Sequence, residues 1–216
     1  MGHHLEMSNW PRRQTFDFFL DYDQPFFNIC AGVDVRPTLE ACRAQGRSFF
    51  LASWYACMKA VNSIEPFRYR LRDKQVWVHD KIHVGATVLT RDEVFRFCYF
   101  EWAETFAAFE EDGIPALEKI KQTPAGGPLV SRDQRDDLVH GSVIPWLSFT
   151  SLAHAKRFDA GLSTPRIAFG KYTTQGEEVH MPVSVEVHHA LMDAIHVARF
   201  FEAFQNELST PTWLNP

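Results

Sequence analysis

Residues 183–196, VSVEVHHALMDAIH, begin with the pattern of a strand and end with the pattern of a helix. The three valines alternate with polar residues, as in a strand with one buried face. Apolar residues then recur at helical spacing through residues 194–208. Side chains at a strand-to-helix junction can face a cleft, and this junction carries His189 and, four residues later, Asp193.

Two interpretations of this junction stay open from the residues alone. His189 can act as a general base, because an imidazole titrates near neutral pH. In the other interpretation His189 is a structural residue with its hydrogen bonds satisfied, and Asp193 is the N-cap of a helix that begins at Ala194, where its carboxylate would accept an unpaired backbone N–H. One HxxxD match in a chain of 216 residues is a weak signal.

Length and composition exclude several classes of function. The 216 residues suffice for one domain with a sizeable core. A net charge of −5 gives no basic footprint for nucleic acid, and no apolar run approaches the ~18 residues of a membrane span. Aromatic residues make up 14% of the chain, which indicates a bulky core, an apolar pocket or an apolar subunit interface.

The cysteines and the first residues point to a reduced, cytoplasmic protein. The four cysteines form no CxxC pair, so we expect neither a zinc site nor a disulfide framework, and we expect no bound metal. No signal peptide is recognisable. Residues 1–6 are interpreted as the remnant of an expression tag before a second start at Met7, with a single domain over residues 7–216. His3 and His4 are therefore left out of the site.

The order of expected elements favours an α+β fold. We expect helices over residues 15–20, 38–45, 48–64, 103–122 and 194–208, and strands over 26–35, 67–71, 76–79, 82–89, 94–101, 142–151, 166–174 and 178–188. The strands over 67–89 are expected to form a meander, and residues 123–138 a loop. Because strands come mostly in adjacent runs, we predict a two-layer sandwich of one mixed, mostly antiparallel sheet covered by helices.

Several short motifs follow one another along nearly the whole chain. They are Asn9-Trp10-x-Arg12-Arg13-x-x-Phe16, Ser142-x-x-Pro145-Trp146-x-Ser148-Phe149-Thr150-Ser151, Gly170-Lys171-Tyr172-x-x-x-Gly176, Met181-Pro182 and Val187-His188-His189-Ala190-x-x-Asp193-x-x-His196. Together they resemble the chloramphenicol acetyltransferase family. The resemblance implies a homotrimer with active sites at subunit interfaces, acetyl-CoA as cosubstrate rather than a bound cofactor, and a small-molecule alcohol as acceptor.

The resemblance also implies roles for particular residues. His189 would be the catalytic base and Ser142 the donor to the tetrahedral intermediate, while Asp193 paired with Arg12 would support the site. His188 and His196 are expected to be structural. The implied acceptor pocket comprises Phe18, Phe19, Phe27, Thr87 and Leu152, and the implied CoA-binding residues are Lys171 and Tyr172.

The chain departs from the family pattern at several positions. Ala194 replaces the glycine after the aspartate, and Ala168 replaces a threonine that holds a water. In the acceptor region, Leu152 and His154 replace phenylalanine and leucine, and Gly85 stands in place of a glutamine. The catalytic residues are thus kept better than the antibiotic pocket.

These departures keep alternatives open. The first is an acyltransferase for an acceptor other than chloramphenicol. The second is a non-catalytic trimer that binds CoA or a small molecule. The third is acyl transfer to a protein-borne thiol, as in the related dihydrolipoamide acyltransferases, whose lipoyl and linker domains this short chain lacks.

Overall fold

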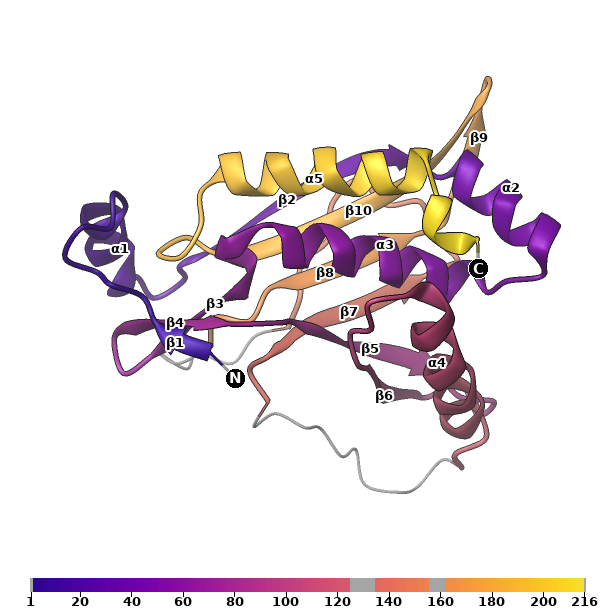
Figure 1. Cartoon of the computed structure of the whole chain (residues 1–216), viewed down its shortest axis with the longest axis horizontal. Helices are drawn as coiled ribbons and strands as arrows, with labels where there is room; N and C mark the ends of the chain where they lie inside the picture. Colours follow the sequence, from indigo (N-terminus) through magenta and orange to yellow (C-terminus); the bar gives the residue numbers. More distant parts are fainter. Residues whose placement is uncertain (1, 125–134, 156–161, 216) are drawn as a thin grey trace.

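Helices separate runs of consecutive strands along the chain in the computed structural model, which describes residues 2–124, 135–155 and 162–215 (Figure 1). The helices are α1 (Arg13–Leu20), α2 (Arg36–Gln45), α3 (Phe49–Ser63), α4 (Phe106–Lys121) and α5 (Ala194–Ser209), with 3-10 turns η1 (Glu65–Arg68) and η2 (Thr212–Leu214). The strands are β1 (Gly2–His4), β2 (Phe26–Asp34), β3 (Tyr69–Arg72), β4 (Gln75–His79), β5 (His83–Leu89), β6 (Phe95–Phe100), β7 (Leu138–Ile144), β8 (Arg166–Gly170), β9 (Thr173–Gln175) and β10 (Glu178–His188).

The larger sheet is mixed and mostly antiparallel, as the sequence predicts. Over the described ranges its strands follow the order β2-β10-β8-β7-β5-β6, with β9 paired to β10. The β5–β7 and β7–β8 pairs are parallel, and the other pairs are antiparallel. The carboxyl ends of β5, β7 and β8 therefore share one end of the sheet, while β10 runs the other way and carries His188 to the opposite end.

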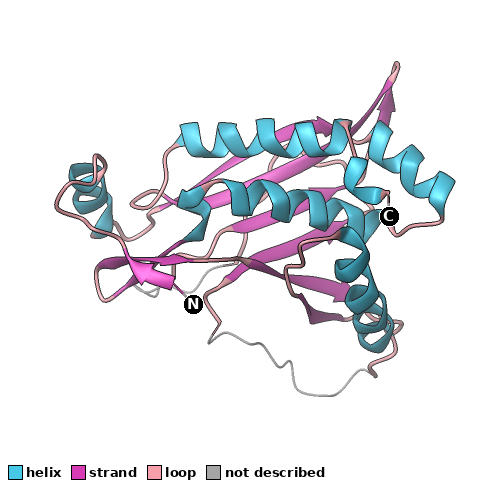
Figure 2. Ribbon diagram, in the orientation of Figure 1, coloured by secondary structure: helices cyan, strands magenta, loops and turns pink. Residues whose placement is uncertain are grey.

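Helices cover one face of this sheet (Figure 2). Helix α3 is buried on almost all sides because its sequence, FFLASWYACMKAVNS, is apolar around most of its circumference. Helix α5 lies beside it, and both pack on the face of β10 that carries Val183, Val185 and Val187, each 0% exposed. The predicted two-layer α+β architecture is confirmed. No helix in the described part of the chain combines the length and apolarity needed to cross a membrane.

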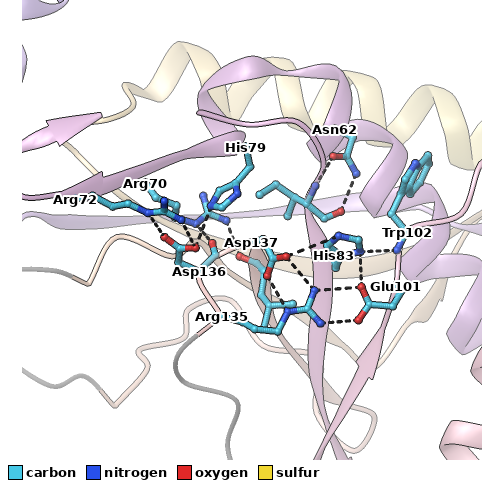
Figure 3. Close-up of polar contacts among 12 residues, drawn as sticks. Asn62, Arg70, Arg72, His79, His83, Glu101, Trp102, Arg135, Asp136 and Asp137 are labelled. Atoms are coloured by element: carbon cyan, nitrogen blue, oxygen red, sulfur yellow. Dashed lines mark hydrogen bonds and ion pairs between the residues drawn. The ribbon is translucent and has the colours of Figure 1, made fainter. Parts of the chain in front are cut away.

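The predicted meander is wrong, because its strands belong to two sheets. Strands β3 and β4 form a separate sheet with β1, whose Gly2 pairs with His79. Residues 2–4, which were assigned to a tag remnant, thus form a strand. Between β4 and β5 the Asn62 amide binds both main-chain groups of Ile82, at 2.8 and 3.0 Å (Figure 3). This clamp directs the chain into the larger sheet, where β5 pairs with β6 and β7.

Strand β10 is buried on both faces, so the expected half-buried strand is also wrong. On the face away from the helices, its polar side chains bind polar side chains of the neighbouring strands. Glu186, 3% exposed, pairs with Arg166 at 2.9 Å, and the buried Ser184 hydroxyl accepts a hydrogen bond from Asn28 at 2.7 Å. Buried polar groups need such partners, and here they let polar residues alternate with core valines.

A network of charged side chains fixes the start of β7 (Figure 3). Arg72 forms two hydrogen bonds to Asp136, at 2.7 and 2.8 Å, and Arg135 binds both Asp137 and Glu101. Burial alone would raise the pKa of Asp136, but hydrogen bonds from His79 and Arg72 hold this pKa below its usual range. These contacts fasten the residues just before β7 to β3, β4 and the end of β6.

Arg70 reinforces the same junction from inside the protein. Its side chain is completely buried, and burial lowers its pKa to about 10. The guanidinium donates to the main-chain carbonyls of Phe67, Tyr69, Asp136 and Leu138. A buried cation needs every donor paired, so Arg70 joins η1 and β3 to the first residues of β7.

Two strands are shorter than predicted. Strand β7 ends at Ile144 instead of residue 151, because a turn follows at residues 145–146. The expected strand over 166–174 divides into β8 and β9, with Lys171 and Tyr172 between them. The expected hairpin is present between β9 and β10, where Gly176 has a positive φ of 62°. Most of the loop expected over 123–138 lies outside the described residues.

Candidate active site

The imidazole of His189 is held between two phenylalanines at the end of β10. The Phe19 ring of α1 stacks on it with centroids 3.8 Å apart, and the Phe27 ring of β2 lies at 4.7 Å. The His189 side chain remains 33% exposed. Its backbone N–H donates to the Pro25 carbonyl at 2.7 Å, so both the backbone and the ring are fixed while part of the ring faces solvent.

Arg12 and Asp193 form a bidentate pair beside this histidine. Arg12 Nε and Nη2 donate to the two Asp193 oxygens, each at 2.7 Å. The same guanidinium donates to the carbonyls of His189, at 3.0 Å, and Ala190, at 2.9 Å. Asp193 also occupies the N-cap position of α5. Asp193 thus combines the two roles expected from the sequence: it stands at the N-cap of α5, and it pairs with Arg12, which precedes α1.

The charges around Asp193 favour its ionised form. Hydrogen bonds from Arg12 hold the pKa of Asp193 below its usual range, although partial burial acts against them. His189 Nδ1 lies 3.4 Å from Asp193 Oδ1. A carboxylate near Nδ1 favours the tautomer with the proton on that nitrogen. The lone pair of the other nitrogen, Nε2, is then available to accept a proton.

His188 and His196 occupy different surroundings from His189. His188 is 3% exposed, its Nδ1 accepts the Ala190 N–H at 3.2 Å, and burial lowers its pKa to about 4. His196 Nδ1 accepts the Asp193 N–H at 2.9 Å, and burial lowers its pKa as well. Each ring holds main chain near the junction.

Ser142 and Thr87 form a pair of hydroxyls on the sheet face opposite the helices. Their oxygens lie 3.3 Å apart, on the parallel neighbours β7 and β5. Ser142 also pairs in register with Ala168 of β8, so the residue that replaces the expected threonine stands directly beside it. Both hydroxyls are partly exposed.

One chain does not bring Ser142 and His189 together. Ser142 is in register with Ala168, which is in register with Ser184 of β10, and His189 lies five residues beyond Ser184. At about 3.3 Å per residue and 4.8 Å per strand, the two lie roughly 16 Å apart along the sheet and about 10 Å apart across it. A single chain thus holds two separate parts of the predicted site.

The remaining predicted acceptor residues divide between these two parts. Phe18 is 62% exposed and packs on Phe19 and Tyr22, next to His189. Leu152 is partly buried and follows β7 on the irregular segment after Ile144. Phe18, Phe19 and Phe27 therefore accompany the histidine, while Thr87 accompanies Ser142.

A pocket of about 540 Å³ opens at the end of the sheet opposite His189. Its apolar wall and its polar edge come from many elements: Phe49, Phe50, Ser53, Thr87, Val88, Leu89, Lys121, Val143, Pro145, Trp146, Phe169, Gly170, Lys171, Tyr172 and Met181. The predicted coenzyme residues Lys171 and Tyr172 lie here, both exposed. We call this cavity the lysine-edged pocket.

Sequence reasoning missed several residues of this pocket. Phe49, the first residue of α3, is only partly buried and contacts the Tyr172 ring edge-on at 5.7 Å. Trp146, 62% exposed, and Lys121 were given no role. A group of exposed aromatic residues beside a lysine would have indicated this pocket, but these residues lie in separate segments of the sequence. No cluster of metal-ligating side chains is found in the described ranges.

The chain is similar to several known proteins. The family described as chloramphenicol acetyltransferase matches residues 3–205. A relative of that name from Streptomyces acrimycini is 29% identical over 97% of this chain and 96% of its own length. A solved chloramphenicol acetyltransferase superposes with a TM-score of 0.87 at 26% identity, covering 96% of this chain and 100% of its own. A dihydrolipoamide acetyltransferase of Azotobacter vinelandii shares the fold, with a TM-score of 0.67 at 15% identity over 93% of this chain and 88% of its own.

Proposed function

This chain belongs to the chloramphenicol acetyltransferase family and is an acyltransferase, and on that premise we propose that it transfers the acetyl group of acetyl-CoA to an alcohol, with His189 as general base. The observation that carries the proposal is the placement of His189. Its ring is clamped by Phe19 and its main chain by Arg12, and yet a third of its side chain remains exposed.

The chemistry requires a base and a donor to the developing negative charge. Nε2 of His189 removes the proton of the acceptor hydroxyl as its oxygen attacks the thioester carbonyl. The Ser142 hydroxyl donates to the oxyanion of the tetrahedral intermediate, a contribution of about 3 kcal/mol where the geometry is good. Collapse of the intermediate breaks the carbon–sulfur bond, and the imidazolium returns its proton to the departing CoA sulfur.

Asp193 and Arg12 act on position rather than on the proton itself. Arg12 binds the carbonyls of His189 and Ala190 as well as Asp193, so it fixes the main chain that carries the base. A base displaced by about 1 Å can cost on the order of 100-fold in rate. The pair thus supports catalysis without touching the reacting atoms.

A complete site needs two chains. Ser142 and His189 of one chain lie too far apart for a single substrate, and the aromatic residues beside His189 are exposed. We infer a homotrimer in which His189 of one subunit meets Ser142 and Thr87 of the next, so that the acceptor binds at the subunit interface. The lysine-edged pocket, which includes Thr87, supplies acetyl-CoA to that interface.

A second candidate is the same reaction with an acceptor other than chloramphenicol. A Cβ on Gly85 would lie 3.1 Å from the Tyr99 ring, so this ring covers the position where the family has a glutamine. Ala168, beside Ser142, lacks the hydroxyl expected there. These changes alter the acceptor face and leave His189 and Ser142 in place.

The decisive assay follows release of CoA thiol by the purified protein with acetyl-CoA, with and without chloramphenicol, and then with a panel of apolar and aromatic alcohols. Chloramphenicol-dependent release supports the main proposal. Release only with other alcohols supports the second candidate. Binding of CoA with no release for any acceptor would contradict both and favour a non-catalytic binding protein.

Mixed trimers test the interface directly. His189→Ala and Ser142→Ala chains are each expected to be nearly inactive alone. When they are refolded together in equal amounts, about a quarter of the sites in random cyclic trimers combine both intact residues. Recovered activity near that fraction supports a shared site, whereas no recovery contradicts it.

The biological setting is part of the proposal. The four cysteines are free, which suits the reducing cytoplasm, and residues 7–216 form one acyltransferase domain. The reaction uses no metal, and neither nucleic acid nor a membrane takes part. If chloramphenicol is the acceptor, the protein confers resistance to it, which growth of an expressing host on the drug would reveal.

A further inference from the structure

We propose that Lys121, at the end of α4, binds a phosphate group of the coenzyme together with Lys171. The proposal deepens the proposed function, since it names a residue of the coenzyme site that the family resemblance does not supply. It starts from the composition of the lysine-edged pocket. Lys121 and Lys171 are the two charged residues in its lining, which among the described residues includes no aspartate or glutamate.

The pocket matches the two halves of an acyl-CoA. Its inner wall includes Val143, Phe169 and Met181, an apolar surface suited to the pantetheine arm. Thr87 also lines it, and its strand β5 is the parallel neighbour of β7, which carries Ser142. The lysines come from two distant segments, and cations beside an apolar channel suit the diphosphate and the 3′-phosphate.

Lys121 is held in place by its backbone, and its side chain makes an exposed ion pair. Its carbonyl accepts the Arg91 N–H at 3.3 Å, which ties the end of α4 to the turn between β5 and β6. Its Nζ lies 3.0 Å from Glu118, and both side chains are about half exposed. Exposed pairs of this kind contribute little, so a phosphate can replace Glu118 as the partner.

Lys171 supplies the second cation from a different element. Its N–H donates to the Leu147 carbonyl at 2.8 Å, which fixes its position after β8. Among the described contacts of the chain, its ammonium has no carboxylate partner within 4.0 Å. Tyr172 follows, 37% exposed, with its ring against Phe49, and an exposed ring can stack on an adenine. The ammonium groups of Lys121 and Lys171 and the ring of Tyr172 thus surround the same opening.

Direct binding of CoA and of pantetheine tests this assignment without any turnover. We expect Lys121→Ala to weaken CoA binding by about three- to tenfold, as for one charge-assisted hydrogen bond in a partly exposed site. Lys171→Ala should have a similar effect. Pantetheine, which lacks the phosphates, should bind both variants as it binds the unchanged protein. Raising the salt concentration should reduce the effect of each substitution.

Lys119→Ala is the matched control, because Lys119 lies on the same helix, is exposed and does not line the pocket. It should leave CoA binding within about twofold, since it removes only a long-range charge. Unchanged CoA binding by Lys121→Ala, or equal losses for CoA and pantetheine, would overturn the role of Lys121 even if acetyl transfer proceeds. If CoA binding depends on Lys121 but no acetyl group is transferred, the phosphate-binding role of Lys121 would be supported and the proposed function contradicted. A protein that binds no CoA would overturn both.

Discussion

The two ends of β10 are built in different ways. At its carboxyl end, His189 is fixed by directional contacts: a stacked ring, a bidentate ion pair and hydrogen bonds to main-chain carbonyls. At its amino end, the lysine-edged pocket is formed by apolar side chains from many elements and by two lysines with weak contacts. The contacts at the His189 end fix one position of the imidazole, whereas the lysine-edged pocket offers a surface whose shape and charge suit a coenzyme.

This difference fits the division of labour that we propose. A base must sit within hydrogen-bond reach of one proton, so small displacements are costly. A coenzyme of many atoms spreads its binding energy over many contacts, and losing one contact changes affinity modestly. Substitutions at the histidine end should therefore change rate and stability strongly, and those at the pocket end should change affinity weakly.

The largest effect is expected from His189→Ala. It removes the proposed base, so kcat should fall by about 10³- to 10⁴-fold while the fold is retained. Steady-state kinetics and thermal unfolding measure the two consequences. His180→Ala is the control, because His180 lies on β10 and, among the contacts of the described residues, pairs with the exposed Glu178. A near-normal rate for His189→Ala would remove the basis of the comparison.

Ser142→Ala should have the next largest effect. Losing one donor to the oxyanion lowers kcat by about 100-fold, with little change in the KM for acetyl-CoA. Thr87→Ala on the adjacent strand should cost less, because Thr87 contacts the Ser142 hydroxyl rather than the oxyanion. Equal losses for both variants would mean that the hydroxyl pair acts as a unit.

Arg12→Ala should destabilise the protein by about 3 kcal/mol, because it leaves two carbonyls and a partly buried carboxylate without their donor. Denaturant unfolding measures this loss. Arg12→Lys keeps the charge but not the forked geometry, so it should recover only part of it. The neighbouring Arg13, in an exposed pair with Asp17, should cost less than about 1 kcal/mol when replaced by alanine. Similar losses at both arginines would contradict a special role for Arg12.

The pH dependence of stability tests the buried histidine next to the base. Burial lowers the His188 pKa from 6.5 to about 4, so between these values the unfolded chain binds a proton that the folded protein does not. Stability should therefore rise by about 2 to 3 kcal/mol as pH increases from 4 to 6.5. His188→Gln should flatten this rise in unfolding experiments across the range. An unchanged slope would show that His188 protonates freely in the folded protein.

The histidine end could be predicted from sequence because its contacts depend on residue type. Only an arginine can bind a carboxylate and two carbonyls at once as Arg12 does, so the motif that contains it is strict. The family resemblance implied the pairing of Arg12 with Asp193 across 181 positions, and the structure contains that pair. The two-layer fold was predicted from the order of the expected elements, in which the strands come mostly in adjacent runs.

Only part of the pocket end could be predicted, and the division into two sheets could not. Lys171 and Tyr172 were expected from the family resemblance, whereas Trp146 belongs to a quoted motif but was given no role. Any apolar side chain of fitting size can line a channel, so Phe49 carries no local signature, and Lys121 resembles any lysine at a helix end. The separation of β4 from β5 depends on one amide, Asn62, clamped to Ile82. Burial of Glu186 on a strand that reads as half-exposed depends on Arg166, twenty residues away.

The charged network at the start of β7 has a consequence for how the protein can vary. Because Arg70 and Arg72 bind Asp136 and Arg135 binds Asp137, the strand is anchored where it enters the sheet. Changes elsewhere in the protein that spare these three arginines should then leave Ser142 in register.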